Sequence, residues 1–402
     1  MRHEYGVTRA PARLIFGPGQ RAALGPAAAS LGRRALICTD ARVAGLPLMR
    51  ELLADLAAHG VATEVFDGTE AELPLSGIRT CVERYRAYDP DVLIGIGGGS
   101  CIDLAKVVSL LLTHPEPVSE YYGEFKVPGP VKPVIAIPTT AGTGSEVTPV
   151  AVIADPDRAM KVGISSPELI PHTAICDPEL TVSCPQGLTA LSGADAMAHA
   201  LEAFSAIRRA PDPSMAMQRV FVGKNILSDQ YALAAIRLIS GHLATAVEDG
   251  SNLEARSAVM LGSTYAGLAF GTAGTCAAHA IQYPVGAQTH TPHGLGIGVL
   301  LPYTMEFNIE VSAGVYAEVA RAMGLSTAGT EREAAMAAIS TIRSLFRRIG
   351  IPQNLRDLGL EPAHLDAMAE QSMGAARLVE NNPRTLDVQS IRSILDHAMN
   401  GA

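Results

Sequence analysis

The fold of the N-terminal half is decided by the segment Asp91-Val-Leu-Ile-Gly-Ile-Gly-Gly-Gly-Ser100. Its apolar run is typical of a strand that is buried on both faces of a parallel sheet. The glycines that follow mark a tight turn, and a helical pattern then runs through Asp103, Lys106 and Leu111. We therefore predict a strand–turn–helix unit with a glycine-rich loop at the carboxyl end of the strand.

Similar units surround this segment. The predicted strands are residues 13–16, 34–40, 61–66, 91–96 and 134–138, and the predicted helices between them are residues 22–31, 48–59, 77–88 and the one that follows Ser100. Strands that alternate with helices indicate an open, mostly parallel α/β sheet. From about Gln186 onward the strand-like runs give way to alanine- and leucine-rich helical segments, which include residues 253–270 and 314–323. We predict an α/β domain over residues 1–184 and an all-helical domain over residues 185–402.

Composition limits the class of protein. The chain has 402 residues, a net charge of -9 and no tryptophan, and 48% of its residues are hydrophobic. The acidic balance disfavours nucleic-acid binding, and the apolar content predicts a large core. The N-terminus lacks the apolar run of a signal peptide, no stretch is long enough to span a membrane, and the six cysteines form no Cys-x-x-Cys pair. We expect a cytoplasmic protein with reduced cysteines that is not bound to a membrane.

Two polar loops follow predicted strands and are candidates for ligand binding. In open α/β sheets, ligands bind at the carboxyl ends of the strands. The backbone N–H groups of Gly97, Gly98, Gly99 and Ser100 would suit a pyrophosphate, although a flexible turn is an equally good interpretation of this short motif. Asp40, just after the second strand, suits hydrogen bonding to a ribose or, alternatively, capping of a helix.

A second set of candidate residues lies in the helical half. Asp195 and His199 are four residues apart, so on a helix both side chains share one face. Folding could bring His279 and His293 to the same point. One carboxylate with three imidazoles suits Fe(II) or Zn(II), whereas Ca²⁺ and Mg²⁺ prefer oxygen ligands. The alternative is an ordinary helix in which the aspartate and the histidine make hydrogen bonds within the protein.

Taken together, these motifs resemble the iron-containing (group III) alcohol dehydrogenase family, within the dehydroquinate synthase-like superfamily. The resemblance extends over most of the chain. Its specific parts are Gly97-Gly-Gly-Ser-x-x-Asp-x-x-Lys106, the run from Pro138 to Thr148, Gly193-x-Asp-x-x-x-His-x-x-Glu202, and His279 with Pro292-His-Gly294.

The resemblance implies a Rossmann-like domain, a helical domain and an active site in the cleft between them. It implies a metal-dependent, NAD(P)-linked enzyme that transfers hydride between nicotinamide and a small alcohol or aldehyde, in a homodimer. The implied metal ligands are Asp195, His199, His279 and His293, for Fe(II) or Zn(II). The implied nucleotide contacts are Asp40, Gly97, Gly98, Gly99, Ser100, Asp103, Thr139, Thr140, Thr143 and Lys161, with NAD favoured by Asp40 and NADP as the alternative.

The chain departs from the family at one position. Many members have a second histidine four residues after the third metal ligand, where it is associated with proton relay, but here Tyr283 occupies that position. Tyr283 and His290 are the predicted relay residues, and water is a third route. The alternatives are a maleylacetate reductase-like enzyme, a Zn(II) polyol dehydrogenase and a non-catalytic NAD-binding protein. Residues 271–293 contain no arginine or lysine, which disfavours the dianionic maleylacetate.

Overall fold

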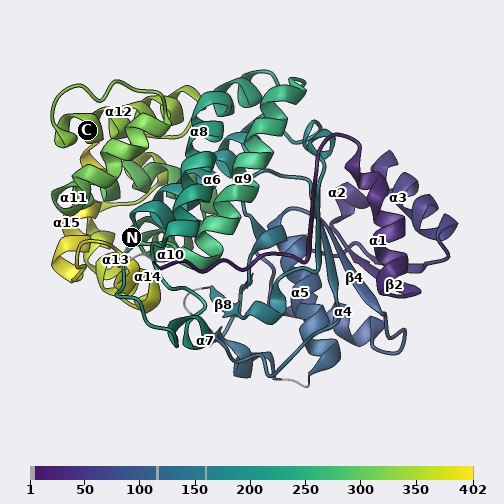
Figure 1. The fold of residues 1–402 in the computed structure, drawn as a ribbon. Helices are drawn as coiled ribbons and strands as arrows, with labels where there is room; N and C mark the ends of the chain where they lie inside the picture. The colour runs from purple at the N-terminus through teal and green to yellow at the C-terminus, as the bar shows by residue number, and fades with distance from the viewer. Residues whose placement is uncertain (1–4, 115–116, 159–160, 402) are drawn as a thin grey trace. The chain divides into compact units, whose positions relative to one another are not determined.

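The structure is a computed structural model that describes residues 5–114, 117–158 and 161–401. The chain divides into two compact units. The α/β unit comprises residues 9–183 and 217–220, and the helical unit comprises residues 5–8, 184–216 and 221–401. Helices and strands of both units are labelled in Figure 1.

The α/β unit is built on a six-stranded parallel sheet with the strand order β1-β9-β6-β4-β2-β3. Its strands are β1 (Arg13–Phe16), β2 (Arg34–Cys38), β3 (Ala62–Phe66), β4 (Val92–Gly97), β6 (Val134–Pro138) and β9 (Thr173–Cys176). The chain leaves β2 toward β3 on one side and returns to β4 on the other side. The carboxyl ends of β2 and β4 therefore flank the point at which the strand order reverses, where ligands bind in sheets of this kind.

Helices cover both faces of this sheet because neighbouring strand residues point in opposite directions. The helices are α1 (Leu24–Leu31), α2 (Ala41–Ala44), α3 (Pro47–Ala58), α4 (Leu75–Tyr85) and α5 (Gly99–Thr113). Ile37 and Ile94 join the core cluster that contains residues of α1 and α3. Leu36 and Leu93 join the cluster that contains residues of α4 and α5. The predicted parallel α/β fold is confirmed.

A second, three-stranded sheet was not predicted from the sequence. It has the order β5-β8-β7 and comprises β5 (Gly123–Glu124), β7 (Val150–Ile153) and β8 (Val162–Ser165). These strands have two to four residues each, which is too short for a clear alternation of polar and apolar residues. Ala151, Ile153 and Ile164 add to the core cluster beneath α4 and α5.

The described part of the second unit contains helices and no strand. Its helices are α6 (Gln186–Ser205), α8 (Ile226–Glu248), α9 (Leu253–Ala273), α10 (Ala277–Thr289), α11 (His293–Ala322), α12 (Glu331–Arg348), α13 (Leu365–Ser372), α14 (Ala376–Asn381) and α15 (Val388–Asn400), with α7 (Met215–Gln218) at the border of the units. Helix α6 packs against α8, α9 and α11. The all-helical second domain that the sequence predicts is therefore present.

Two helices of this unit differ from the prediction. The helix predicted from Gly314 is present as the part of α11 that follows a kink at Ser312, but α11 already begins at His293 and continues through Pro302, which was not predicted. Helix α10 also contains an internal proline, Pro284. The proline and glycine residues of these segments predict turns from the sequence alone. In the structure, tertiary packing keeps both segments helical.

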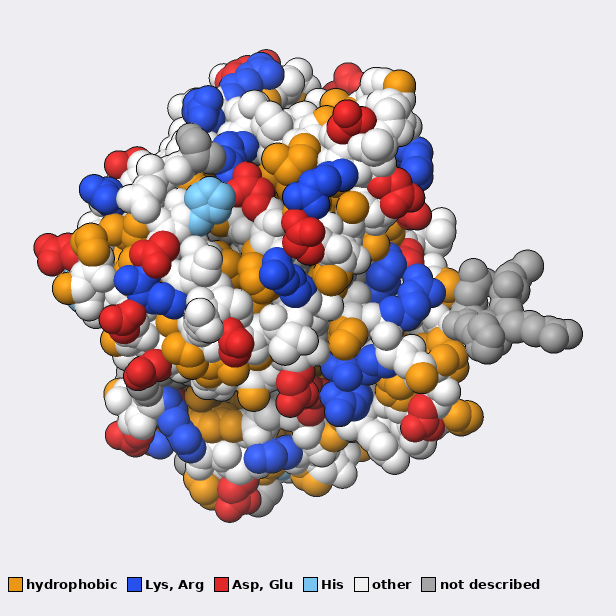
Figure 2. Space-filling model, turned by 90° about the vertical axis from the view of Figure 1, so that its left-hand side faces the viewer, with side chains coloured by type: hydrophobic (Ala, Val, Ile, Leu, Met, Phe, Trp, Pro, Cys, Tyr) orange, Lys and Arg blue, Asp and Glu red, His pale blue; other side chains and the backbone are white. Residues whose placement is uncertain are grey.

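The surface on one face carries charges of both signs. On the face shown in Figure 2, basic and acidic side chains are interspersed, and no continuous basic patch is visible among its described residues. Among the described helices, none combines the length and the apolar character that a membrane crossing requires. All six cysteine side chains are buried.

A buried lysine joins α5 to the small sheet. Lys106 is fully buried, and its Nζ donates hydrogen bonds to the carbonyl oxygens of Thr148 at 3.0 Å and Val150 at 2.7 Å. It lies 3.8 Å from Asp103 Oδ1. Burial lowers the pKa of Lys106 to about 8, although the neighbouring Asp103 opposes this shift.

We expect Lys106→Met to lower the free energy of unfolding by about 3 kcal/mol, because it leaves Asp103 buried without its cation. Urea unfolding of the wild type and the variant measures this loss. The exposed Lys126 provides a control, and Lys126→Met should change the stability by no more than about 0.5 kcal/mol. Equal stability of the Lys106 variant and the wild type would contradict the structural role.

Candidate metal centre and dinucleotide loops

The candidate metal centre begins with two side chains on one face of α6. Asp195 and His199 lie one turn apart and are both buried. His199 Nε2 is 3.8 Å from Asp195 Oδ1. The imidazole of His199 stacks on the ring of Phe270 with a centroid distance of 4.1 Å, so packing fixes its orientation.

Two further histidines reach the same carboxylate oxygen. His279, in the first turn of α10, places Nε2 at 3.7 Å from Asp195 Oδ1, and His293, the first residue of α11, places Nε2 at 3.8 Å. A glycine allows this approach of α11 to α6. A Cβ added to Gly294 would lie 2.4 Å from the backbone oxygen of Leu191, so only glycine fits there.

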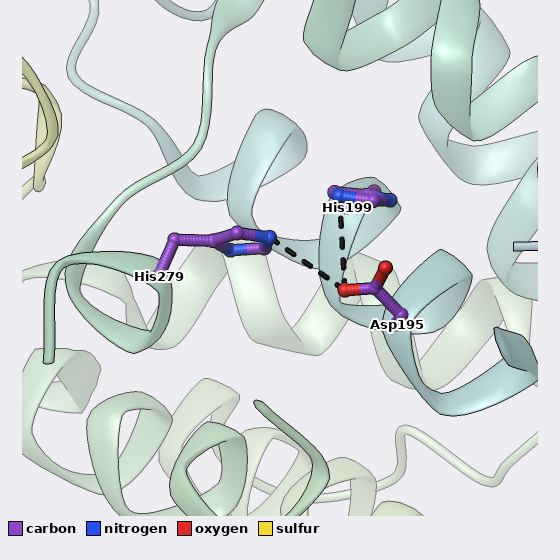
Figure 3. A group of neighbouring side chains, drawn as sticks. All are labelled: Asp195, His199 and His279. Carbon is purple, nitrogen blue, oxygen red and sulfur yellow. Dashed lines mark ion pairs between the residues drawn. The ribbon is translucent and has the colours of Figure 1, made fainter. Parts of the chain in front are cut away.

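The atoms of this cluster fit a metal ion. Ligand atoms of Asp195, His199 and His279 lie within 4.8 Å of one another, and Figure 3 shows the two imidazoles directed at the carboxylate. Asp195 Oδ1 and His279 Nε2 are buried and have no hydrogen-bond partner among the described residues. Burying polar atoms without partners is costly, whereas a bound divalent cation would satisfy both. The structure thus brings together all four predicted ligands.

A carboxylate that we did not predict as a site residue orients His279. Glu202, one turn after His199 on α6, accepts a hydrogen bond from His279 Nδ1 at 2.5 Å. It also accepts from the backbone N–H groups of Cys276 at 3.0 Å and Ala278 at 2.7 Å. Burial raises the pKa of Glu202 to about 7, and the backbone hydrogen bonds oppose the shift. The spacing 195–199–202 was the sequence signal for this residue, because all three positions share one helix face.

Hydrogen bonding and burial also determine the form of His279. With Nδ1–H donated to Glu202, the lone pair of Nε2 is directed at Asp195, as metal binding requires. Burial, followed by the neighbouring His199, lowers the pKa of His279 to about 3. The neutral imidazole is therefore favoured before any metal binds.

The two predicted relay residues lie in different environments. The ring of Tyr283 stacks on His293 with a centroid distance of 6.2 Å. Burial raises the pKa of the Tyr283 phenol, and the charge of Arg377 opposes this rise. His290 is exposed and has a left-handed backbone conformation at the end of α10. The geometry favours Tyr283, and both relay roles stay predictions.

The first glycine loop forms a cradle at the carboxyl end of β4. Gly97 has a φ of 145°, Gly98 caps α5, and α5 begins at Gly99. A Cβ on Gly97 would lie 2.6 Å from Cys101 Sγ, and one on Gly99 would lie 2.8 Å from Thr143 Cγ2. The open backbone at the start of a 15-residue helix is a suitable anion site. It therefore fits the pyrophosphate role predicted for residues 97–100.

The threonine loop after β6 lies against this cradle. The backbone N–H of Thr139 donates to the Gly97 oxygen at 2.9 Å. A Cβ on Gly98 would lie 3.8 Å from Thr140 Oγ1. The buried Oγ1 of Thr139 has no hydrogen-bond partner among the described residues, which fits a ligand contact. Thr143 Oγ1 accepts a hydrogen bond from the N–H of Ser145 at 3.2 Å.

The remaining predicted nucleotide contacts already have partners within the protein. Asp40 caps α2 through a bond from Val43 N at 2.8 Å, and its Oδ2 lies 3.7 Å from Cys101 Sγ beside the first loop. Asp103 accepts bonds from Ser145 Oγ and from Val152 N at 2.9 Å. Lys161 forms an ion pair with Glu72. Capping by Asp40 is compatible with ribose binding, and the nucleotide roles of Asp40, Asp103 and Lys161 stay predictions.

Comparison with protein families agrees with this fold. Residues 11–178 match the model of the iron-containing alcohol dehydrogenases, and residues 189–399 match the model of the C-terminal domain of the Fe-containing alcohol dehydrogenase family. The fold and the two family matches define the protein as a metal-dependent oxidoreductase that uses a nicotinamide dinucleotide. The chain belongs to the iron-containing alcohol dehydrogenase family.

Individual relatives match along nearly the whole chain. A sulfoacetaldehyde reductase of Bilophila wadsworthia is 32% identical over 372 residues, which cover 91% of each protein. A crystal structure of a 1,3-propanediol oxidoreductase has a TM-score of 0.91 at 32% identity and covers 98% of this chain and 100% of that one. The NAD⁺ complex of a sulfoacetaldehyde reductase from Bifidobacterium kashiwanohense has a TM-score of 0.84 at 26% identity, with 98% of each chain covered.

We expect Glu202→Gln to weaken metal binding by about 10- to 100-fold, because a residue that orients a metal ligand contributes to affinity on this scale. The amide NH₂ would also oppose the backbone N–H groups of Cys276 and Ala278. Competition with a chromogenic chelator measures the affinity for Fe(II) or Zn(II) without any turnover. The surface variant Glu248→Gln, which loses only an exposed pairing with Arg348, is the control. Unchanged metal affinity in the Glu202 variant would refute the orienting role.

Proposed function

We propose that this protein reduces a short aldehyde to its primary alcohol with NADH, and catalyses the reverse reaction with NAD⁺, using Fe(II) in preference to Zn(II). The observation that carries this proposal is the convergence of three imidazole Nε2 atoms on Asp195 Oδ1 at 3.7 to 3.8 Å. The overall reaction moves a hydride from NADH to the carbonyl carbon and a proton to the carbonyl oxygen.

We assign the metal to Asp195, His199, His279 and His293 and the dinucleotide to residues of the segment 1–184. When bound, the metal acts as a Lewis acid that favours negative charge on the substrate oxygen. Asp195 supplies a negative charge that offsets part of the cation's charge. Glu202 keeps His279 in the tautomer that can bind the metal. The predicted cleft between the two domains and the homodimer stay predictions.

On the dinucleotide side, the proposal rests on the open backbone at Gly97–Ser100 and the buried hydroxyl of Thr139. The N–H groups at the start of α5 would bind the pyrophosphate. Asp40, next to this loop, would accept hydrogen bonds from the adenosine ribose and repel a 2′-phosphate. NAD is therefore the proposed cofactor.

For the proton, we propose Tyr283 as the donor to the product oxygen. Its ring contacts His293, and its hydroxyl is the acidic group at the position where many family members have a histidine. His290 is the second candidate. Because its side chain is exposed, it would pass the proton through solvent water.

Metal-stripped protein should recover aldehyde-dependent NADH oxidation when Fe(II) or Zn(II) is restored, with Fe(II) giving the higher rate. His199→Ala should lose this turnover by at least about 100-fold, since removing a ligand disrupts the metal centre. It should still bind NADH, which fluorescence titration measures. His242→Ala, a half-buried histidine on α8, is the matched control and should retain activity. Retained turnover in the His199 variant would contradict the metal assignment.

We expect Asp40→Ser to shift the ratio of kcat/KM for NADH over NADPH toward NADPH by about tenfold, because a negative charge that repels the 2′-phosphate is removed. Serine can still cap α2, so the local fold should persist. The exposed Asp67 follows β3 in the same unit, and Asp67→Ser is the control. An unchanged ratio in the Asp40 variant would show that the carboxylate acts only as a helix cap.

A further inference from the structure

Two helices of the helical unit meet at a short turn that leads to one of the predicted metal ligands. Helix α9 ends at Ala273 and α10 begins at Ala277, so residues 274–276 form the turn. Gly274 has a φ of 83°, a backbone conformation that favours glycine. His279 is the third residue of α10. The path of the turn therefore determines where the backbone of His279 lies.

The end of α9 is held by an amide that is distant in sequence. The last carbonyl groups of a helix have no donor within the helix. Asn381, the last residue of α14, is 2% exposed, and its Nδ2 donates to the backbone oxygens of Ala273 at 3.0 Å and Thr275 at 3.2 Å. An amide NH₂ has two hydrogens, so one side chain links both oxygens. A Cβ on Gly274 would lie 2.9 Å from the same nitrogen, so the glycine leaves room for the amide.

The start of α10 is held by a side chain from another helix. Cys276, the N-cap residue, makes no side-chain hydrogen bond to the first turn of α10. Instead, Glu202 of α6 accepts hydrogen bonds from the backbone N–H groups of Cys276 and Ala278. The same carboxylate accepts from His279 Nδ1. One carboxylate thus holds both the beginning of the helix and the imidazole that the helix carries.

Cys276 joins the two groups that hold the turn. Its thiol lies 3.3 Å from the backbone oxygen of Asn381 and 3.6 Å from the backbone oxygen of Glu202. The Asn381 oxygen also accepts a hydrogen bond from the N–H of Ile207, two residues after the end of α6, at 2.9 Å. A continuous series of contacts therefore leads from α14 through the turn to α6, the helix that carries Asp195 and His199.

We propose that Asn381 is a positioning residue for the metal centre, because it holds residues 274–276 in the conformation in which Glu202 can orient His279. This inference rests on the proposed metal assignment. Asn381 acts through the turn and through Glu202, without itself binding the metal. Without the amide, the carbonyl groups of Ala273 and Thr275 would lose a donor in a buried environment, which is costly. The turn would then relax, and the N–H groups that face Glu202 would move with it.

The test measures metal affinity and metal geometry rather than turnover. Asn381→Ala should weaken the binding of Zn(II), measured by competition with a chromogenic chelator, by about tenfold, the lower end of the effect of residues that orient metal ligands. It should also shift the visible absorption bands of the Co(II)-substituted protein, because these bands depend on the arrangement of the ligands. Asn381→Ser, which keeps a hydroxyl donor, is the second variant and should give a loss between that of Asn381→Ala and none.

Asn308→Ala is the matched control. Asn308 and Asn382 are both buried, and their side-chain amides exchange hydrogen bonds at 3.0 and 2.8 Å. Removing this contact disturbs the residue next to Asn381 and should lower the melting temperature. It should nevertheless leave the Zn(II) affinity within about threefold of the wild type and the Co(II) bands unchanged. Equal losses of affinity in the Asn308 and Asn381 variants would overturn the inference in favour of a general effect on stability.

A double-mutant cycle tests the route through Glu202. Because Asn381 is proposed to act through Glu202, Asn381→Ala should weaken Zn(II) binding by less than about twofold when Glu202→Gln is already present. Additive losses in the double variant would overturn the inference. Unchanged affinity in Asn381→Ala, beside a weakened Glu202→Gln, would also overturn it and would leave the proposed function intact. A wild-type protein that binds no metal would instead refute the proposed metal centre, and this inference with it.

Discussion

Three histidine side chains of the helical unit lie around one carboxylate oxygen, Asp195 Oδ1. Three imidazole nitrogens from α6, α10 and α11 lie within 3.8 Å of it, and the oxygen itself is buried without a hydrogen-bond partner among the described residues. Such an arrangement is unfavourable unless a cation satisfies it. This arrangement supports the proposed metal centre in the helical unit.

Small residues make this convergence possible. Gly294 allows the start of α11 to approach the backbone of α6, and Gly193 on α6 faces Leu243 of α8, where a Cβ would clash with that side chain. Glu202 then fixes His279 by accepting three hydrogen bonds, two of them from the backbone at the start of α10. Close helix packing and the buried carboxylate of Glu202 together determine the direction of the ligand atoms. The spacing of the ligands in the sequence does not determine it.

The sequence predicted five of the six strands of the main sheet, the change to a helical second half and the residues that meet around Asp195, because each depends on local periodicity or on motifs shared with a family. The sixth strand, β9, has only four residues and was not predicted. The sequence did not predict β5, β7 and β8, whose two to four residues carry little periodic signal. It also did not predict the helical course of α10 and the start of α11, where tertiary packing overrides proline and glycine.

The two candidate sites differ in which group carries the negative charge. At the glycine loop, neutral backbone N–H groups and the start of α5 face the expected pyrophosphate, so no cluster of basic side chains is required there. A chain with a net charge of -9 can therefore still be expected to bind a dinucleotide at this loop. At the metal centre, by contrast, the protein itself supplies the negative charge, because the Asp195 carboxylate lies among three imidazoles and would offset part of the charge of a cation. The helical unit would therefore bind a cation through side chains, whereas the α/β unit would bind an anion through its backbone.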